Sequence, residues 1–256
     1  MKKVIAEMGG KNAILVDEDA DPDEAISAIV QSAMDFQGQK CSACSRVLVP
    51  KGMVDTFSNR LASAVAARKI GPAENPDCKI GPVIDQESQL RIERFIQEAS
   101  KKTNLVYRGD VGGLKDHGYY VAPAIFSGAD PQSDLCQEEI FGPVLAVIGY
   151  ESFGHGVEIA NQVPYALTAG LFSRNPDRVE LFQNQIEAGN VYINRKITGA
   201  MVHRQPFGGF KLSGLGSKAG GKDYLLQFVL QRTITENTIR RGFAPGAISR
   251  SFLIES

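Results

Sequence analysis

The sequence has few of the side chains that build metal centres and disulfide scaffolds. It contains 4 cysteines and 3 histidines in 256 residues. A structural zinc site needs about four ligands, and a disulfide scaffold needs a much denser set of cysteines. We therefore assign no metal ligands, and we expect the sparse cysteines to be free thiols in a reducing compartment.

An excess of charge of one sign and long apolar runs are also missing. Lys and Arg number 28 against 29 Asp and Glu, a formal net charge of −1, so the composition offers no basic surface for nucleic acid or an anionic membrane. No apolar run approaches the roughly 20 residues of a membrane helix, and the N-terminus lacks the apolar stretch of a secretion signal. The sequence predicts a cytoplasmic protein with no nucleic-acid partner and no membrane partner.

What the sequence does contain is a regular alternation of strand and helix patterns, in a chain that is 43% hydrophobic. Apolar, β-branched runs occur at residues 12–17, 45–50, 144–150, 166–173 and 190–194. Helical periodicity occurs at residues 23–36, 54–69, 86–101 and 178–188, with a shorter helix near residue 157. This alternation predicts an α/β fold, a mostly parallel open sheet with helices on both faces. Ligands are expected at the carboxyl ends of its strands.

The segment FQGQKCSACSR contains two thiols, Cys41 and Cys44, at the spacing of metal and redox motifs. A redox pair of the thioredoxin type lies between a strand and a helix start, whereas this pair follows a predicted helix and leads into a strand. Cys41 is therefore either a structural thiol or a nucleophile. Gly38 permits a tight turn, and Lys40 and Arg46 bring positive charge that would favour the thiolate. Cys44, which enters the strand, is interpreted as structural.

Two other stretches contain carboxylates that could take part in chemistry. Glu7 ends a short predicted strand at residues 4–7 and precedes two glycines, so it is a candidate base for a nucleophile without a partner histidine. The stretch EEIFGPV at residues 138–144 places two carboxylates before an aromatic residue and a turn. A solvated charge at a strand end and a charged turn before a core strand remain open as alternatives.

A conventional nucleotide-binding loop is not found. GSKAGGK at residues 216–222 has the spacing of a phosphate-binding loop, but Asp223 stands where a Ser or Thr would hold magnesium. No β-branched strand precedes it, and its glycines are wrongly spaced for a dinucleotide fingerprint.

Taken together, four motifs give the chain a resemblance to a known family. They are EMGGKN (7–12), GQKC (38–41), EEIFGPV (138–144) and PFGGFKLSG (206–214). With this order and separation, the chain resembles the aldehyde dehydrogenase superfamily over residues 4–243. Through GQKCSACSRV, GNVYINRKITGAMVHRQPFGGFKLSG and TENTIRRGF it resembles more closely the 1-pyrroline-5-carboxylate (glutamate-semialdehyde) dehydrogenases. The resemblance implies NAD-dependent oxidation of glutamate semialdehyde to glutamate in proline catabolism.

The resemblance also implies catalytic and cofactor-binding roles for individual residues. Cys41 would attack the aldehyde to form a thiohemiacetal, with its backbone N–H donating to the developing oxyanion. Glu7 would activate the water that hydrolyses the later thioester. Glu139 would hold the nicotinamide ribose of NAD, and Phe141 would pack near the nicotinamide.

For the substrate, the resemblance implies a small aldehyde that carries a carboxylate. The carboxylate would be held by the hydroxyl of Ser42 and the backbone amides of Gly199 and Ala200, with Phe207 as an aromatic wall. Amide and hydroxyl donors suit this task because hydrogen bonds to a charged group are roughly twice as strong as neutral ones.

Members of the superfamily carry an NAD-binding half and an oxyanion-hole asparagine ahead of the EMGGKN stretch. We expect residues 1–243 to be the catalytic domain alone, with residues 244–256 as a tail. The isolated chain is then expected to bind NAD weakly or not at all and to be inactive as a dehydrogenase. The complete enzyme is expected to be a homo-oligomer, or to assemble with a separate NAD-domain partner. The alternatives are a domain that acts on another aldehyde and a noncatalytic oligomerisation module.

Overall fold

The computed structural model describes residues 2–237 and is built around one seven-stranded sheet. In spatial order its strands are β4 (Asn104–Arg108), β5 (Ala124–Ser127), β6 (Val144–Tyr150), β3 (Cys44–Pro50), β2 (Asn12–Val16), β8 (Thr168–Phe172) and β9 (Asn190–Ile193). Neighbouring strands are parallel except β4 and β5, which pair antiparallel at one edge. The predicted mostly parallel sheet is confirmed, although β5 was not predicted.

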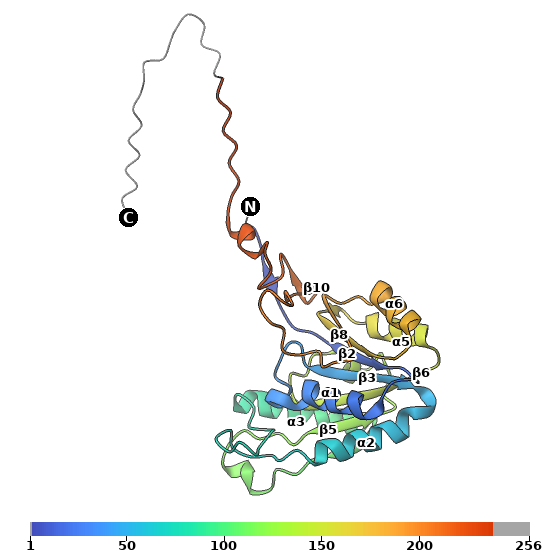
Figure 1. Ribbon diagram of the computed structural model, residues 1–256. Helices are drawn as coiled ribbons and strands as arrows, with labels where there is room; N and C mark the ends of the chain where they lie inside the picture. The colour runs from blue at the N-terminus through green and yellow to red at the C-terminus, as the bar shows by residue number, and fades with distance from the viewer. Residues whose placement is uncertain (1, 238–256) are drawn as a thin grey trace, which may run out of the picture.

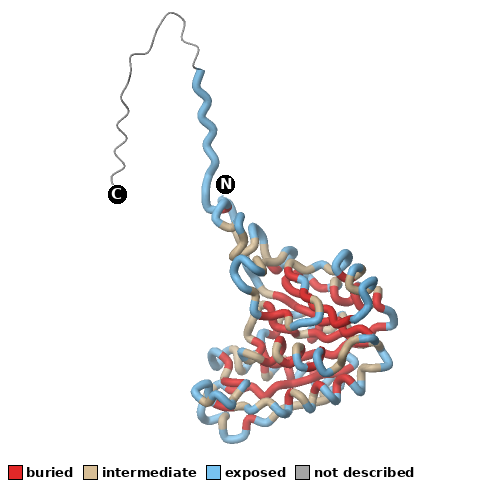
Figure 2. Tube along the Cα trace, in the orientation of Figure 1, coloured by how far each residue is buried: buried red, intermediate tan, exposed pale blue. Residues whose placement is uncertain are grey.

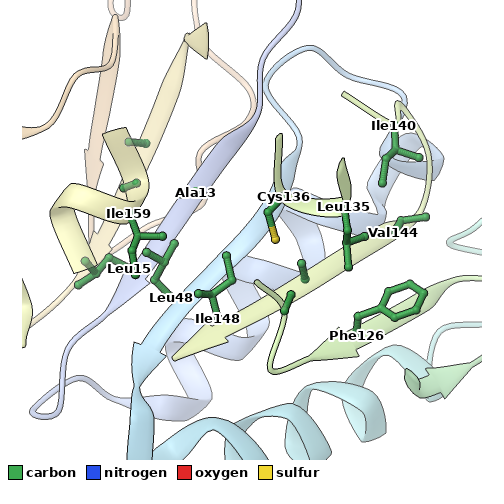
Figure 3. Packing of buried hydrophobic residues seen from close by; sticks show 14 of the residues in the cluster. Ala13, Leu15, Leu48, Phe126, Leu135, Cys136, Ile140, Val144, Ile148 and Ile159 are labelled. Carbon is green, nitrogen blue, oxygen red and sulfur yellow. The ribbon is translucent and has the colours of Figure 1, made fainter. Parts of the chain in front are cut away.

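Helices cover both faces of this sheet, as predicted. They are α1 (Pro22–Met34) and α2 (Val54–Ala66) on one face, and α3 (Gln86–Ser100), α4 (Asp134–Gln137), α5 (Phe153–Asn161) and α6 (Pro176–Gln185) on the other. On β2, Ile14 packs with α1 and α2, whereas Leu15 belongs to the opposite cluster with Leu48 and Ile159 (Figure 3). Successive side chains of a strand point to opposite faces, so a strand buried on both sides is apolar throughout.

The limits of two helices differ from the prediction for local reasons. The helix predicted at residues 23–36 is wrong at its end: α1 stops at Met34, because Phe36 and Gln37 have left-handed φ angles of 63° and 58° in the short 3-10 turn that follows. The helix predicted at residues 178–188 begins earlier, at Pro176. The side chain of Asn175 accepts the N–H groups of the first turn there, and proline suits the first helical position.

A slender arm, formed by residues 2–7 and 214–237, extends from the layered body (Figure 1). In it β1 (Ala6–Glu7) pairs antiparallel with β11 (Gly214–Leu215), and the 3-10 helix η4 (Tyr224–Phe228) follows. Nearby, β10 (Phe210–Lys211) pairs with β7 (Tyr165–Ala166). Figure 2 shows that the arm is mostly exposed, unlike the buried sheet. The strand predicted at residues 4–7 is thus only two residues long and lies outside the main sheet.

Two predictions about the extent of the chain are only partly covered by the structure. The predicted catalytic domain is described up to residue 237, and the predicted tail at residues 244–256 lies outside the described residues.

Among residues 2–237, none of the helices has both the length and the apolar composition that crossing a bilayer requires.

Candidate active site

Five of the eight predicted site residues line one cavity of about 550 Å³. They are Cys41, Ser42, Phe141, Ala200 and Phe207. Gly199 precedes Ala200 in the chain and has a φ of 81°, a conformation that favours glycine. The structure therefore brings together segments that are up to 166 residues apart in sequence, counting from Cys41 to Phe207 (207 − 41).

This cavity lies at the amino ends of the parallel strands. Cys41 and Ser42 immediately precede β3, and Phe141 immediately precedes β6, which runs parallel to β3 as its neighbour. The expectation that the ligand site lies at the carboxyl ends of the strands was wrong for these residues. The motifs occupy the loops that lead into strands, and parallel strands bring such loops together at their amino edge.

The thiol of Cys41 is half-buried in this cavity. Burial raises its pKa, and the carboxylates of Glu7 and then Glu139 raise it further. The backbone N–H groups of Ser42 and of Cys41 itself act in the opposite direction and lower the pKa. Amide donors that favour the thiolate would equally favour an oxyanion formed next to the sulfur.

The positive charge expected to assist this thiol is directed elsewhere. The ammonium group of Lys40 lies over the ring of Phe36, 5.3 Å from its centroid. The guanidinium of Arg46 is fully buried and donates to the carbonyl oxygens of Lys11, Ile159 and Ala160. The prediction that these two cations lower the pKa of Cys41 was therefore wrong, since the pKa is raised.

A constrained turn precedes the nucleophile. Phe36, Gln37 and Gly38 are consecutive residues with positive φ, at 63°, 58° and 67°. A side chain at Gly38 would collide with the carbonyl of Gly142, in the loop that contains Phe141. The turn predicted from Gly38 is confirmed, and the close approach of the two loops explains why this position requires glycine.

Glu7 is exposed in the two-residue strand β1, opposite Gly214 of β11. It is not among the residues that line the cavity, yet its carboxylate is close enough to the Cys41 thiol to raise its pKa. An exposed carboxylate next to a half-buried thiol can hold a water molecule or accept a proton, as a general base must.

The Glu139 carboxylate lies between the nucleophile loop and the glycines of the EMGGKN motif. Its Oε1 accepts a hydrogen bond from the N–H of Gly10 at 3.0 Å, and a side chain at Gly9 would collide with it. Burial raises its pKa. Phe141, two residues on, has a φ of 54° and is 37% exposed, so its ring offers a surface beside the thiol.

Lys11 is a buried lysine that the sequence analysis did not single out. It is 2% exposed, and its Nζ has no hydrogen-bond partner. Burial and then the neighbouring charge of Arg46 lower its pKa to about 7. Since Lys11 also lies near Glu139, its charge favours the ionised form of that carboxylate.

The interpretation of Cys44 as structural agrees with its environment. Its thiol is buried in β3 and donates to the carbonyl of Arg46 at 3.4 Å, and burial raises its pKa to about 12. Among residues 2–237, no cluster of three or more metal-ligating side chains is present. Cys41 lies in the loop before β3, and Cys44 is the first residue of that strand.

Three residues that support the cavity were missed. Asn12 and Thr168, both buried, contact the backbone of the nucleophile turn. Gln205 accepts the N–H of Met201 through Oε1 at 3.0 Å and so fixes the loop that follows Ala200. Asn12 is part of the EMGGKN motif, so the motif itself was a signal; Thr168 and Gln205 are brought near only by the fold.

The fold and this cavity together define a class of protein. Residues 1–234 match the family described as the aldehyde dehydrogenase family, and the chain belongs to that family. Among curated proteins it is 42% identical over 236 residues to a 1-pyrroline-5-carboxylate dehydrogenase of Geobacillus sp. (strain WCH70), covering 92% of this chain and 45% of that protein. The enzyme of the same description from Bacillus subtilis (strain 168) gives the same figures. The chain thus spans about half the length of the curated relatives it matches.

Solved structures give the same picture. The chain resembles proline utilization A (PutA) from Bdellovibrio bacteriovorus with a TM-score of 0.89 and 49% identity, covering 95% of this chain and 25% of that chain. It also resembles the structure of 1-pyrroline-5-carboxylate dehydrogenase from Thermus with bound NAD. The TM-score is 0.83 and the identity 42%, and the match covers 88% of this chain and 43% of that chain.

Proposed function

We propose that this chain is the thiol-bearing part of an NAD-dependent 1-pyrroline-5-carboxylate dehydrogenase, which oxidises glutamate semialdehyde to glutamate in proline catabolism. The main support is that Cys41, Ser42, Phe141, Ala200 and Phe207 line one cavity. The relatives described as 1-pyrroline-5-carboxylate dehydrogenases add the substrate class. Homo-oligomerisation, a separate NAD-domain partner and a cytoplasmic location remain predictions.

The proposed chemistry depends on a thiol flanked by a carboxylate and by backbone donors. The sulfur of Cys41 attacks the aldehyde carbon, and the N–H of Cys41 stabilises the developing oxyanion. Glu7, whose charge reaches the thiol, accepts a proton and later activates the water that hydrolyses the thioester. Because the pKa of the thiol is raised, a base speeds its reaction at neutral pH, although the small thiolate fraction also reacts without one.

The residues present also fit one end of a dinucleotide. Glu139 supplies a half-buried carboxylate that can accept hydrogen bonds from ribose hydroxyls, and the exposed ring of Phe141 can pack against a nicotinamide. When bound, NAD supplies the hydride acceptor. Weak or absent binding of NAD by this chain alone, and its inactivity as a dehydrogenase, remain predictions, because two side chains do not position a whole cofactor.

A protection experiment tests the substrate class without any cofactor. Glutamate semialdehyde should slow alkylation of Cys41 by iodoacetamide, because thiohemiacetal formation consumes the thiol. Butanal, which lacks a carboxylate, should protect only at concentrations about tenfold or more higher, since hydrogen bonds to a charged group contribute about 1.5–3 kcal/mol. The rate at each cysteine is read by peptide mass mapping, and Cys78 serves as the internal control.

A matched variant links the protection to the proposed carboxylate site. Ser42→Ala should weaken protection by glutamate semialdehyde several-fold and leave protection by butanal unchanged, because only the carboxylate uses the hydroxyl. Equal protection by both aldehydes in the parent chain would favour another aldehyde as substrate. No protection by either would favour the noncatalytic module.

A further inference from the structure

Three consecutive carbonyl groups of the nucleophile turn accept hydrogen bonds from two buried side chains. The side-chain amide of Asn12 donates to the carbonyls of Cys41, at 2.7 Å, and Ala43, at 2.9 Å. The hydroxyl of Thr168 donates to the intervening carbonyl of Ser42 at 3.4 Å. Three consecutive carbonyls are therefore bound to the first residues of β2 and β8.

The two supporting residues are themselves fixed. Oδ1 of Asn12 accepts the N–H of Thr168 at 3.0 Å, and both residues are 3% exposed. A side chain at Gly10 would come within 2.8 Å of the Cys41 carbonyl oxygen, so this part of the backbone lies directly against the turn. The contacts are thus part of a rigid strand edge, to which the turn is attached.

Each carbonyl shares a planar peptide group with the N–H of the following residue, so holding the carbonyls of Cys41 and Ser42 orients the N–H groups of Ser42 and Ala43. The N–H of Ala43 closes the turn by donating to the carbonyl of Lys40 at 2.9 Å. The carbonyl of Lys40 shares its peptide group with the N–H of Cys41, so this hydrogen bond sets the Cys41 amide as well, and the N–H groups of Cys41 and Ser42 both favour the thiolate. A donor pair of this kind is effective only if its orientation is set before the charge develops.

We propose that Asn12 and Thr168 are positioning residues, which hold the carbonyls of Cys41, Ser42 and Ala43 against the sheet edge. They orient the N–H of Ser42 directly, and they orient the N–H of Cys41 through the hydrogen bond from Ala43 to Lys40, so that both groups face the sulfur. Neither residue touches the substrate. The inference rests on the proposed role of Cys41, and it adds the source of the amide orientation. Glu7 and Glu139 also act on this thiol, so both are left unchanged in every variant.

The test measures the pH dependence of Cys41 alkylation by iodoacetamide in the 256-residue chain, with each cysteine followed by mass mapping. Asn12→Leu keeps the approximate volume and removes both donors without adding charge. It should raise the apparent pKa of Cys41 by about one unit and slow alkylation below that pKa about tenfold. Thr168→Val, which removes one hydroxyl, should slow it about threefold, and Thr168→Ser should restore the parent rate.

Asn194→Leu is the matched control. The side chain of Asn194 also donates to a carbonyl and accepts an N–H, both of Ser173, but it does so at the opposite, carboxyl end of the sheet. It should destabilise the fold and leave the pH profile of Cys41 unchanged. If Asn12→Leu does not fold, Thr168→Val and Thr168→Ser decide the question.

The outcomes separate this inference from the function it rests on. Parent-like pH profiles for Asn12→Leu and Thr168→Val would overturn the positioning role, even if glutamate semialdehyde protects Cys41 normally. A parent chain whose Cys41 is not protected by the aldehyde would contradict the proposed function, whereas a displaced pH profile in the variants would still support the turn geometry.

Discussion

Replacing Cys41 with alanine is expected to abolish the hydrolysis of an activated aryl ester by this chain. Ester hydrolysis uses the thiol, the base and the backbone donors but needs no hydride acceptor, so the chain should retain it in slow form. One oxyanion donor contributes about 3–4 kcal/mol of transition-state stabilisation, so hydrolysis that relies on the backbone donors alone is expected to be slow. Release of the aryl alcohol measures the rate of hydrolysis. In Cys41→Ala this rate should fall to that of buffer alone.

Cys44→Ala provides the matched control for this experiment. Cys44 is buried and its pKa is raised to about 12, so it holds almost no thiolate at neutral pH. Its removal should leave the hydrolysis rate within about twofold of the parent, as expected of a residue that does not take part. A Cys41→Ala chain that hydrolyses the ester as fast as the parent would show that the activity arises elsewhere and would favour the noncatalytic module.

Replacing Arg46 with methionine should produce the largest loss of stability. The four hydrogen bonds of its buried guanidinium satisfy the carbonyls of Lys11, Ile159 and Ala160, at 2.7 to 3.1 Å. Ile159 and Ala160 are in the last turn of α5, whose carbonyls have no partner within the helix and attract positive charge. Each buried carbonyl left without a donor costs about 1–3 kcal/mol, so we expect the free energy of unfolding to fall by about 3–5 kcal/mol.

Urea denaturation at pH 7 measures this loss, with Arg60→Met as the control. Arg60 makes an ion pair with Asp23 at the surface, at 2.5 Å. Surface ion pairs contribute little, and its replacement should change the free energy of unfolding by about 0.5 kcal/mol or less. A similar small effect for Arg46→Met would mean that water replaces the guanidinium, and that the link between β3 and α5 is not structural.

The sequence predicted the elements whose signal is local. The apolar spacing of residues 86–101 corresponds to α3, and the β-branched runs correspond to β2, β3, β6, β8 and β9. The end of α1 was not predictable, because neither Phe36 nor Gln37 is a residue type that favours positive φ. Their conformation accompanies the close approach of Gly38 to Gly142, which are 104 residues apart (142 − 38), and such a contact has no local signal.

The site shows the same division between local and distant signals. Five of the residues predicted from the motifs, Cys41 among them, line one cavity, because the loops that meet there each carry part of the pattern. The electrostatic prediction failed, since closeness in sequence does not give the direction of a side chain. Arg46 is five residues after Cys41, yet it points to α5, whose position depends on the whole sheet.

Cys41 is expected to act as the nucleophile, and Glu7 as the base that activates water to hydrolyse its acyl group. The most direct measurement is the site of acylation in Glu7→Gln after brief treatment with an activated aryl ester, by intact mass and peptide mapping. We predict a burst of about one aryl alcohol per chain, a slow steady state, and one acyl group on Cys41. Acylation of Cys78, or a chain that turns over without accumulating any acyl group, would contradict the account.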